Sequence, residues 1–331
     1  MANFFIKYLK FSLKKVHKNL IKFLARNIPF LYKWLHFLPN NKLVLYNYKS
    51  NRFRAKVVSI ISLTTVLFSR YSKSRDVVHK KVTFKSTFFD FNLNLDLNEF
   101  TQCGYYFDMP NNDLIQLLKL GGNVFIDIGA NVGFFSLTAS HTFNKVLSFE
   151  PTPSSLNNLR DNIKLNGFKN IDVFDCALSE KPGSSKLYVN PLNSGGNSLI
   201  NFSKAMTKKS GIDVWENFEV TVNTLDNIIM NKDTSVGSLD LLKIDIEGHE
   251  VSAIKGAKNT ISSFKPLIYA EVSKSRENME KILQELPKLY SPFYLQKLEI
   301  IVIGKGDDVP LDVLFIPSDK LNKLRQKLKS S

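Results

Sequence analysis

Two short stretches of this 331-residue chain hold most of the residues whose types and spacing could do chemistry. The first is Asp-Ile-Gly-Ala-Asn-Val-Gly (127–133), which lies between the apolar run Val124–Ile126 and a second apolar run. An apolar strand, a glycine turn and a helix start make the first half of a nucleotide-binding β-α-β unit. Gly129 can adopt backbone angles that other residues avoid, and Gly133 lets the helix approach the strand or a ligand closely.

The charge of this turn indicates which ligand it suits. Its glycines are spaced Gly-x-x-x-Gly, Asp127 stands two residues before Gly129, and Asn131 lies between the glycines. A carboxylate at that position would repel a pyrophosphate and attract a cation. S-adenosylmethionine carries a sulfonium, an ammonium and a ribose diol, so the turn predicts a methyl-donor site that includes Gly133. The alternative is a Rossmann-like turn without a cofactor.

Two further acids follow predicted strands downstream of the turn. Glu150 ends the strand 146–149 and lies 23 residues after Asp127. In dinucleotide folds, an acid about 20 residues past the turn holds the ribose hydroxyls. Asp175 ends the strand 171–174, where it is placed to meet an adenine amino group. The alternative for Glu150 is a solvated acid at the end of a strand.

The second stretch is Asp-Ile-Glu-Gly-His-Glu (245–250), directly after the buried strand 239–244. Open α/β sheets bind ligands at the carboxyl ends of their strands. If the extended backbone continues through the glycine, Asp245, Glu247 and His249 point to one side and become candidates for a general base. The alternative for His249 is a solvated position in the next helix. The spacing of these acids does not support a metal site, so we predict none.

The elements that must position these residues alternate between strands and helices. Helices are expected at 134–141, 154–166, 250–260 and 278–289, between the strands named above and a strand at 266–272. Strands 186–189 and 220–222 predict a β insertion, and 293–302 with 313–316 predict a final antiparallel pair. The predicted fold class is α/β: a Rossmann-like, doubly wound, mostly parallel sheet with an antiparallel C-terminal strand pair, preceded by a basic helical N-terminal segment.

Several blocks in a fixed order resemble the FkbM-type family of S-adenosylmethionine-dependent methyltransferases. The matching blocks are Phe-Ile-Asp-Ile-Gly-Ala-Asn-Val-Gly (125–133), Phe-Glu-Pro (149–151), Leu-Arg-Asp-Asn-Ile-Lys-Leu-Asn-Gly (159–167), Ala-Leu-Ser (177–179), Thr-Leu-Asp (224–226) and Leu-Lys-Ile-Asp-Ile-Glu-Gly-His-Glu (242–250). The resemblance covers residues 122 to 272 and says nothing about residues 1–100. It implies a class I methyltransferase fold and methyl transfer to oxygen, mostly on sugars of polysaccharides, glycolipids or glycosylated natural products.

The resemblance also implies roles for individual residues. Asp127, Gly129 and Asn131 match the donor-binding turn of the family, Glu150 its ribose ligand and Asp175 its adenine-side contact. Asp245 and Glu247 match the Asp-x-Glu-Gly block, which the resemblance places at the edge of the active site. The acceptor implied for the chain is a glycan or another hydroxyl-bearing molecule.

The charge of the chain is concentrated at its N-terminus. Of the net charge of +15, residues 1–75 contribute 16 Lys and Arg and no acid, whereas residues 76–331 hold 29 basic and 30 acidic residues. Within this segment, residues 4–28 read as a helix with an apolar stripe and a lysine stripe, as at a membrane interface. The alternative is that the apolar stripe packs on the protein itself. The apolar run 57–68 is too short to span a bilayer.

These observations set the expected domains, partners and compartment. We expect a basic amphipathic segment (1–81), a methyltransferase domain (82–320) and a basic tail (321–331). Two cysteines make no disulfide framework, and no cleavage site follows the N-terminus, so we expect a cytoplasmic protein, peripheral at an anionic membrane through residues 1–75. Nucleic acid is the competing anionic partner, in an RNA or DNA methyltransferase. A catalytically idle ligand-binding or membrane module is the remaining alternative.

Overall fold

The computed structural model describes residues 81–86, 89–96, 102, 112–190, 194–201, 216–230, 236–296 and 298–330. The chain divides into two units, one of Met1–Lys80 with Asp96–Glu99 and the other of Lys81–Leu95 with Phe100–Ser331. The predicted helix 4–28, the run 57–68 and the basic segment up to residue 80 lie outside the described residues. The fold below is that of the second unit.

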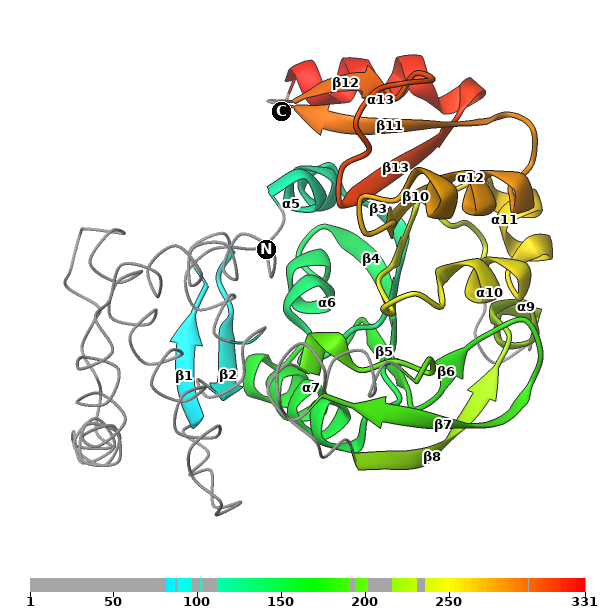
Figure 1. Cartoon of the computed structure of the whole chain (residues 1–331). Coiled ribbons are helices and arrows are strands. Elements are labelled where there is room, and N and C mark those ends of the chain that lie inside the picture. Colours follow the sequence, from blue (N-terminus) through cyan, green and yellow to red (C-terminus); the bar gives the residue numbers. More distant parts are fainter. Residues whose placement is uncertain are drawn as a thin grey trace, which may run out of the picture. The chain divides into compact units, whose positions relative to one another are not determined.

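An eight-stranded sheet forms the centre of this unit (Figure 1). Its strand order is β12-β11-β13-β10-β9-β3-β4-β5. The strands are β3 (Gly122–Ile128), β4 (Phe143–Phe149), β5 (Ile171–Phe174), β9 (Leu241–Ile244), β10 (Leu267–Glu271), β11 (Tyr290–Gln296), β12 (Glu299–Val302) and β13 (Asp312–Pro317).

Pairing in this sheet switches once from parallel to antiparallel, between β10 and β13. The pairs from β10 through β9, β3 and β4 to β5 are parallel. Strands β13, β11 and β12 pair in antiparallel fashion with their neighbours. A doubly wound parallel half with an antiparallel C-terminal end is the class I methyltransferase fold, so the predicted fold class is confirmed. The predicted single strand 293–302 is a hairpin of two strands, β11 and β12.

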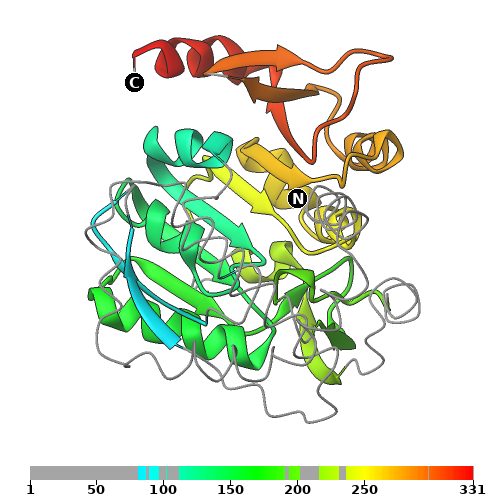
Figure 2. The ribbon, with the colours of Figure 1, turned by 60° about the vertical axis from the view of Figure 1, so that its left-hand side comes forward.

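Helices cover both faces of the sheet, and Figure 2 shows the layers from a second side. They are α5 (Asn112–Lys119), α6 (Phe134–Ala139), α7 (Pro153–Asn166), α9 (Leu225–Met230), α10 (Glu250–Lys255), α11 (Lys258–Phe264), α12 (Arg276–Glu285) and α13 (Ser318–Ser330). The side chains of β3 alternate between two apolar cores, as the pleat of a strand requires: Ile126 and Ile128 belong to one, and Phe125 to the other. Burial on both faces explains why the run Val124–Ile126 in this strand is apolar.

Several predicted boundaries shift by a few residues, such as the helix predicted over 278–289, which is α12. The helix predicted over 250–260 is broken into α10 and α11, and Gly256 at the break lies so close to the backbone of Ser179 that any side chain would overlap it. The boundary predicted after residue 320 falls inside α13, whose Leu324 and Leu328 are buried in the apolar core.

A separate three-stranded sheet fills the predicted β insertion. It has the order β6-β8-β7, with β6 (Ala177–Leu178), β7 (Gly183–Val189) and β8 (Glu216–Asn223). The turn Ser194–Gly196 follows β7, and Ser198 forms a bridge back to Tyr188 on that strand. This sheet and turn therefore stand where a doubly wound fold would usually place a helix.

A short two-stranded sheet of β1 (Lys81–Lys85) and β2 (Asn92–Asp96) attaches to α7 through side-chain amides. Asn166 accepts a hydrogen bond from the backbone N–H of Asn92 at 2.7 Å and donates to its carbonyl at 2.7 Å. Asn162 accepts from the backbone of Asn94 at 2.7 Å and donates to its carbonyl at 3.3 Å. Because the two asparagines are one helical turn apart, they present amide groups as the edge of a neighbouring strand would.

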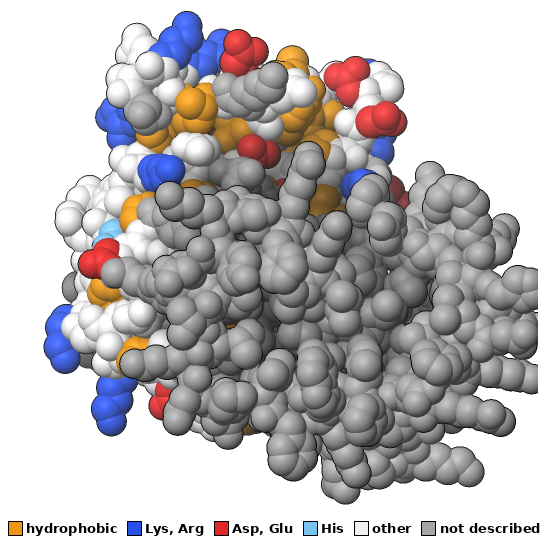
Figure 3. Space-filling view, turned by 90° about the vertical axis from the view of Figure 1, so that its left-hand side faces the viewer, with side chains coloured by type: hydrophobic (Ala, Val, Ile, Leu, Met, Phe, Trp, Pro, Cys, Tyr) orange, Lys and Arg blue, Asp and Glu red, His pale blue; other side chains and the backbone are white. Residues whose placement is uncertain are grey.

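The surface of the described residues mixes chemical types. Figure 3 shows hydrophobic, basic and acidic side chains interspersed on the upper part of one face, at the level of β11, β12 and α13 in Figure 1. None of the helices in the described part of the chain combines the length and the apolar character needed to cross a bilayer.

Candidate functional site

A cavity opens at the carboxyl ends of the central parallel strands. Its volume is about 690 Å³, including space open to solvent. The turn after β3 and the end of β4 form one wall, and the segment after β9 forms another. Residues of the β insertion and of the turn after β7 complete the lining. This is the sheet edge at which open α/β folds bind their ligands.

Five of the nine predicted site residues line this cavity. They are Gly129, Asn131, Glu150, Asp245 and His249. The predicted donor-side and acceptor-side residues, which are about 100 residues apart in the sequence, therefore meet at one cavity because their strands β3 and β9 are adjacent.

The turn after β3 has the strained backbone that its glycine predicts. Gly129 has φ 83° and Asn131 has φ 51°, both in the left-handed region. Any side chain at Gly129 would overlap the carbonyl oxygen of Asp245. The Asn131 amide donates to the Ser194 hydroxyl at 3.0 Å. The turn thus passes within contact of the end of β9 and is tied to the segment after β7.

Glu150 is a buried carboxylate at the cavity wall. Its two oxygens accept hydrogen bonds from the backbone N–H groups of Asn131 and Thr152, each at 2.8 Å. Burial raises the pKa of Glu150, and these hydrogen bonds partly offset that effect. A carboxylate has about four acceptor sites, and the Thr152 side chain also bonds to Glu150, so capacity remains for a ligand hydroxyl. A ribose hydroxyl of the predicted donor is such a group.

Asp127 lies in a different place from the one its charge suggested. It is fully buried and does not line the cavity. One of its oxygens lies 3.0 Å from the ammonium of Lys243, and the other accepts a hydrogen bond from Ser136 at 2.6 Å. Its negative charge is therefore compensated inside the protein. The sequence argument that this acid would attract a cationic ligand did not foresee Lys243, which is the register partner of Asp127 on β9.

Gly133 and Asp175 also lie away from the lining. Gly133 precedes α6 with φ 95°, and a side chain there would overlap Leu159 of α7, so it allows close packing of the two helices. Asp175 follows β5, its side chain is 63% exposed, and an oxygen lies 3.8 Å from the Arg160 guanidinium. Its neighbour Cys176, a buried free thiol, lines the cavity instead.

The backbone after β9 does not stay extended. Strand β9 ends at Ile244, and Glu247 (φ 52°) and Gly248 (φ 92°) form a turn. One oxygen of Glu250 accepts the N–H groups of Ile246 and Gly248, at 3.2 and 3.0 Å, and so stabilises this turn. The extended backbone that would point Asp245, Glu247 and His249 to one side is therefore not present.

His249 is directed toward the β insertion. It precedes α10 and lines the cavity, and its Nε2 lies 2.9 Å from the Ser179 hydroxyl. Burial lowers the pKa of His249, which favours the neutral ring at neutral pH. A neutral ring can accept a proton, although the nitrogen nearest Ser179 is already in a hydrogen bond.

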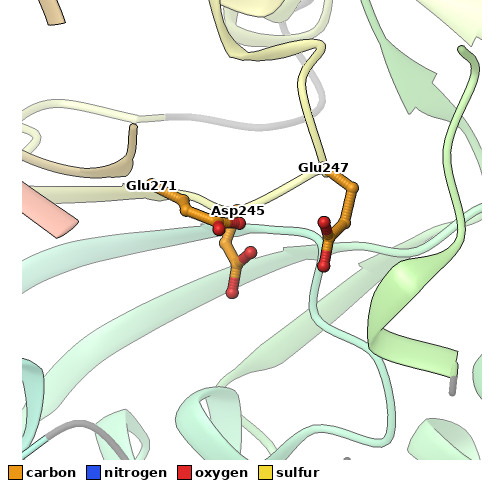
Figure 4. A group of neighbouring side chains, drawn as sticks. All are labelled: Asp245, Glu247 and Glu271. Carbon is orange, nitrogen blue, oxygen red and sulfur yellow. The ribbon is translucent and has the colours of Figure 1, made fainter. Parts of the chain in front are cut away.

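A third carboxylate, that of Glu271, lies beside Asp245 and Glu247, and Glu271 was not among the predicted site residues. One oxygen each of Asp245, Glu247 and Glu271 lie within 4.8 Å of one another, and Figure 4 shows Asp245 between the other two. Burial, followed by repulsion from neighbouring acids, raises the pKa of Glu247 to about 8 and that of Glu271 to about 9. The same three oxygens are of the donor type that Mg²⁺ and Ca²⁺ accept.

Glu271 could have been recognised from its position. It is the last residue of β10, which pairs in parallel with β9, so the two strands end at the same edge of the sheet. The missing information was which strands are neighbours, because that depends on the order of the sheet and not on the local sequence.

A third feature that the sequence analysis did not assign to the site is the segment 194–201. Three side-chain hydrogen bonds attach it to different parts of the cavity wall. Besides the bond between Asn131 and Ser194, Asn197 donates to the Thr152 hydroxyl at 3.1 Å, and Ser198 donates to the Glu247 carbonyl at 2.8 Å. Its polar, glycine-rich sequence indicated a loop but gave no sign of what the loop covers.

Comparison with known proteins identifies relatives that are named as methyltransferases. The family model described as the Methyltransferase FkbM domain matches residues 127–292, half of the chain. Methyltransferase sdnD from Sordaria araneosa is 28% identical over 230 residues, covering 62% of this chain and 82% of that protein. Hexuronic acid methyltransferase AglP from Haloferax volcanii is 24% identical over 186 residues, covering 55% and 70%. The 31-O-demethyl-FK506 methyltransferase FkbM from Streptomyces tacrolimicus is 28% identical over 160 residues, covering 42% and 60%.

Proposed function

Because the chain belongs to the FkbM family of methyltransferases and uses S-adenosylmethionine as its donor, we propose that it methylates a sugar hydroxyl of a glycan, glycolipid or glycosylated metabolite. The observation that carries the proposal is the single cavity that Glu150, the turn after β3 and Asp245 line together. One wall is suited to a nucleoside and the other to a hydroxyl that must lose its proton.

The donor side of the proposal uses residues that line the cavity. Glu150 binds the ribose diol, and the turn Gly129–Asn131 presents its backbone next to the same ligand. Asp127 and Gly133 act indirectly, by holding the turn and the helix after it. Asp175 remains a predicted contact to the adenine. When bound, S-adenosylmethionine supplies a methyl group on a sulfonium, which leaves as the neutral thioether.

The acceptor side must align an oxygen and remove its proton. A sugar hydroxyl is a weak nucleophile, so a positioned base contributes to the rate. Asp245 lines the cavity, and Glu247 and Glu271 hold their protons near neutral pH because their pKa values are about 8 and 9. We assign the acceptor proton to Asp245, with Glu247 beside it and His249 as the second candidate. The remaining work of the site is to exclude water and hold the groups in line.

Two relatives support an oxygen acceptor on a sugar. One is named for methylation of a hexuronic acid, and the other for a 31-O-demethyl substrate. Those names describe their own substrates, and a hydroxyl-bearing sugar is the class that the base-lined wall of this cavity also favours.

The basic N-terminal segment supports a place for the enzyme at an anionic membrane, where lipid-linked glycans would be within its reach. The sequence gives residues 1–75 sixteen Lys and Arg, no acid and an apolar stripe, which suits a bilayer better than nucleic acid. We expect the full chain, but not a chain that begins at residue 76, to sediment with anionic vesicles at low salt. Equal sedimentation of the two would contradict this assignment, and salt-sensitive binding to RNA alone would favour the nucleic-acid alternative.

Calorimetric titration with S-adenosylhomocysteine tests the donor site. Wild-type protein should bind it, and Glu150→Gln should weaken binding at least about tenfold, because it removes a charge-assisted acceptor. Asp161→Asn is the matched control, since this acid is exposed on α7 and should leave the affinity unchanged. A folded wild type that does not bind, or a Glu150→Gln variant with unchanged affinity, would contradict the proposed site.

A further inference from the structure

Lys243 is a buried cation in the block 242–250, and the sequence analysis gave it no role of its own. It lies on β9, is 3% exposed, and its register partner on β3 is Asp127. Burial opposes its charged form, but the nearby carboxylates Asp127 and Asp245 outweigh that effect and raise the pKa of Lys243. The side chain is therefore an ammonium held among anions, and its three protons can serve three acceptors.

The contacts of this ammonium reach both sides of the cavity. Its nitrogen lies 3.0 Å from an oxygen of Asp127, 2.9 Å from the carbonyl oxygen of Gly129 and 3.7 Å from an oxygen of Asp245. A simple counter-ion for Asp127 would need only the first of these contacts. Gly129 and Asp245 both line the cavity, where they follow the adjacent strands β3 and β9.

From these contacts we propose that Lys243 is a positioning residue that couples the donor turn to the acceptor edge through one shared ammonium. It holds the Gly129 carbonyl, so that the turn keeps the shape that faces the donor. The same positive charge orients Asp245, the group that faces the acceptor. The inference rests on the proposed placement of the donor in this cavity. It adds that one residue, Lys243, fixes the positions of both the Gly129 turn and Asp245.

Removing Lys243 alone would leave Asp127 as an unpaired buried charge, and the protein would be expected to unfold. The test therefore compares Asp127→Asn with Asp127→Asn/Lys243→Met, which differ only in the ammonium. Asparagine can still accept from Ser136. Thermal melting of both variants checks the fold, and calorimetry gives their affinities for S-adenosylhomocysteine and S-adenosylmethionine.

Two results are expected. The double variant should bind S-adenosylhomocysteine about tenfold more weakly than Asp127→Asn, because the turn loses a charge-assisted hydrogen bond. Its preference for the cationic S-adenosylmethionine over the neutral product should rise about threefold or more, since the site has become more negative. A packing defect would not produce this second change.

Equal affinities and an equal preference in the two variants would overturn the coupling and leave Lys243 as a structural counter-ion. Should the methionine variant fail to fold, Asp127→Asn/Lys243→Gln offers the Gly129 carbonyl a neutral donor, and its preference for S-adenosylmethionine carries the same test. Failure of the wild-type protein to bind S-adenosylhomocysteine is a different result, because it overturns the donor site and this proposal together.

Discussion

The two walls of the cavity solve the problem of a buried carboxylate in opposite ways. On the proposed donor wall, Glu150 accepts two backbone N–H groups, and behind it the buried Asp127 is paired with Lys243. On the proposed acceptor wall, Asp245 has Glu247 and Glu271 beside it, and mutual repulsion adds to the effect of burial. The first arrangement suits a fixed charge, whereas the second suits groups that hold and release protons.

The difference indicates which wall tolerates change. A group that is satisfied by backbone N–H donors depends on the course of the chain, so a small displacement removes its partners. In a cluster of acidic groups, removal of one group instead lowers the repulsion among those that remain. Substitutions should therefore be costly on the donor wall and stabilising or harmless to the fold on the acceptor wall.

The largest effect is expected at Gly129. Its substitution by alanine places a methyl group against the Asp245 carbonyl and requires φ 83°, so we expect a loss of at least about 3 kcal/mol in the free energy of unfolding, with loss of donor binding. Gly167→Ala is the control: φ is 69° there, but no atom lies within 4 Å of the added carbon. That variant should lose about 1 kcal/mol by urea denaturation and bind S-adenosylhomocysteine normally. Similar losses in both variants would show that contact with Asp245 is unimportant.

An intermediate effect is expected on the acceptor wall, with the opposite sign. The pKa of Glu271 is about 9 in the folded protein against an ordinary value of 4.5, so the folded state binds more protons between these values. Stability should therefore fall as pH rises through this window. Glu271→Gln should melt at a higher temperature than wild type at pH 8 and at nearly the same temperature at pH 5. An equal or lower melting temperature at pH 8 would contradict the crowding of these carboxylates.

The smallest effect is expected at Asp175. Its carboxylate is mostly exposed, and its partner Arg160 is exposed as well, so the ion pair contributes little. We expect Asp175→Asn to change the affinity for S-adenosylhomocysteine less than about threefold, as for one solvated hydrogen bond. A larger loss would support the predicted contact to adenine and would mean that the side chain turns toward the donor on binding.

Much of the donor wall was predictable, because its signals are local. The left-handed backbone of Gly129 and the acid that ends β4 follow from residues within one β-α-β unit. The partner of Asp127 did not follow, since Lys243 is 116 residues further along the chain and meets it only through the register of β3 and β9.

The acceptor wall was less predictable for a related reason. The sequence indicated the cluster 245–250 but neither the turn that separates Glu247 from His249 nor the arrival of Glu271 from β10. The predicted helix over 250–260 is broken at Gly256, which lies against the backbone of Ser179. Each of these features depends on which strands and loops become neighbours, which the local pattern of hydrophobic residues does not encode.

The attachment of β2 to α7 carries a consequence for how the chain can diverge. Asn162 and Asn166 recognise only the main-chain groups of the strand, and these groups are the same for almost every amino acid. The junction therefore depends on two asparagines of the helix, and the side chains of the strand could change without loss of these four bonds. Because Asn162 also donates to the Val132 carbonyl, one side chain holds both the strand and the turn that follows β3.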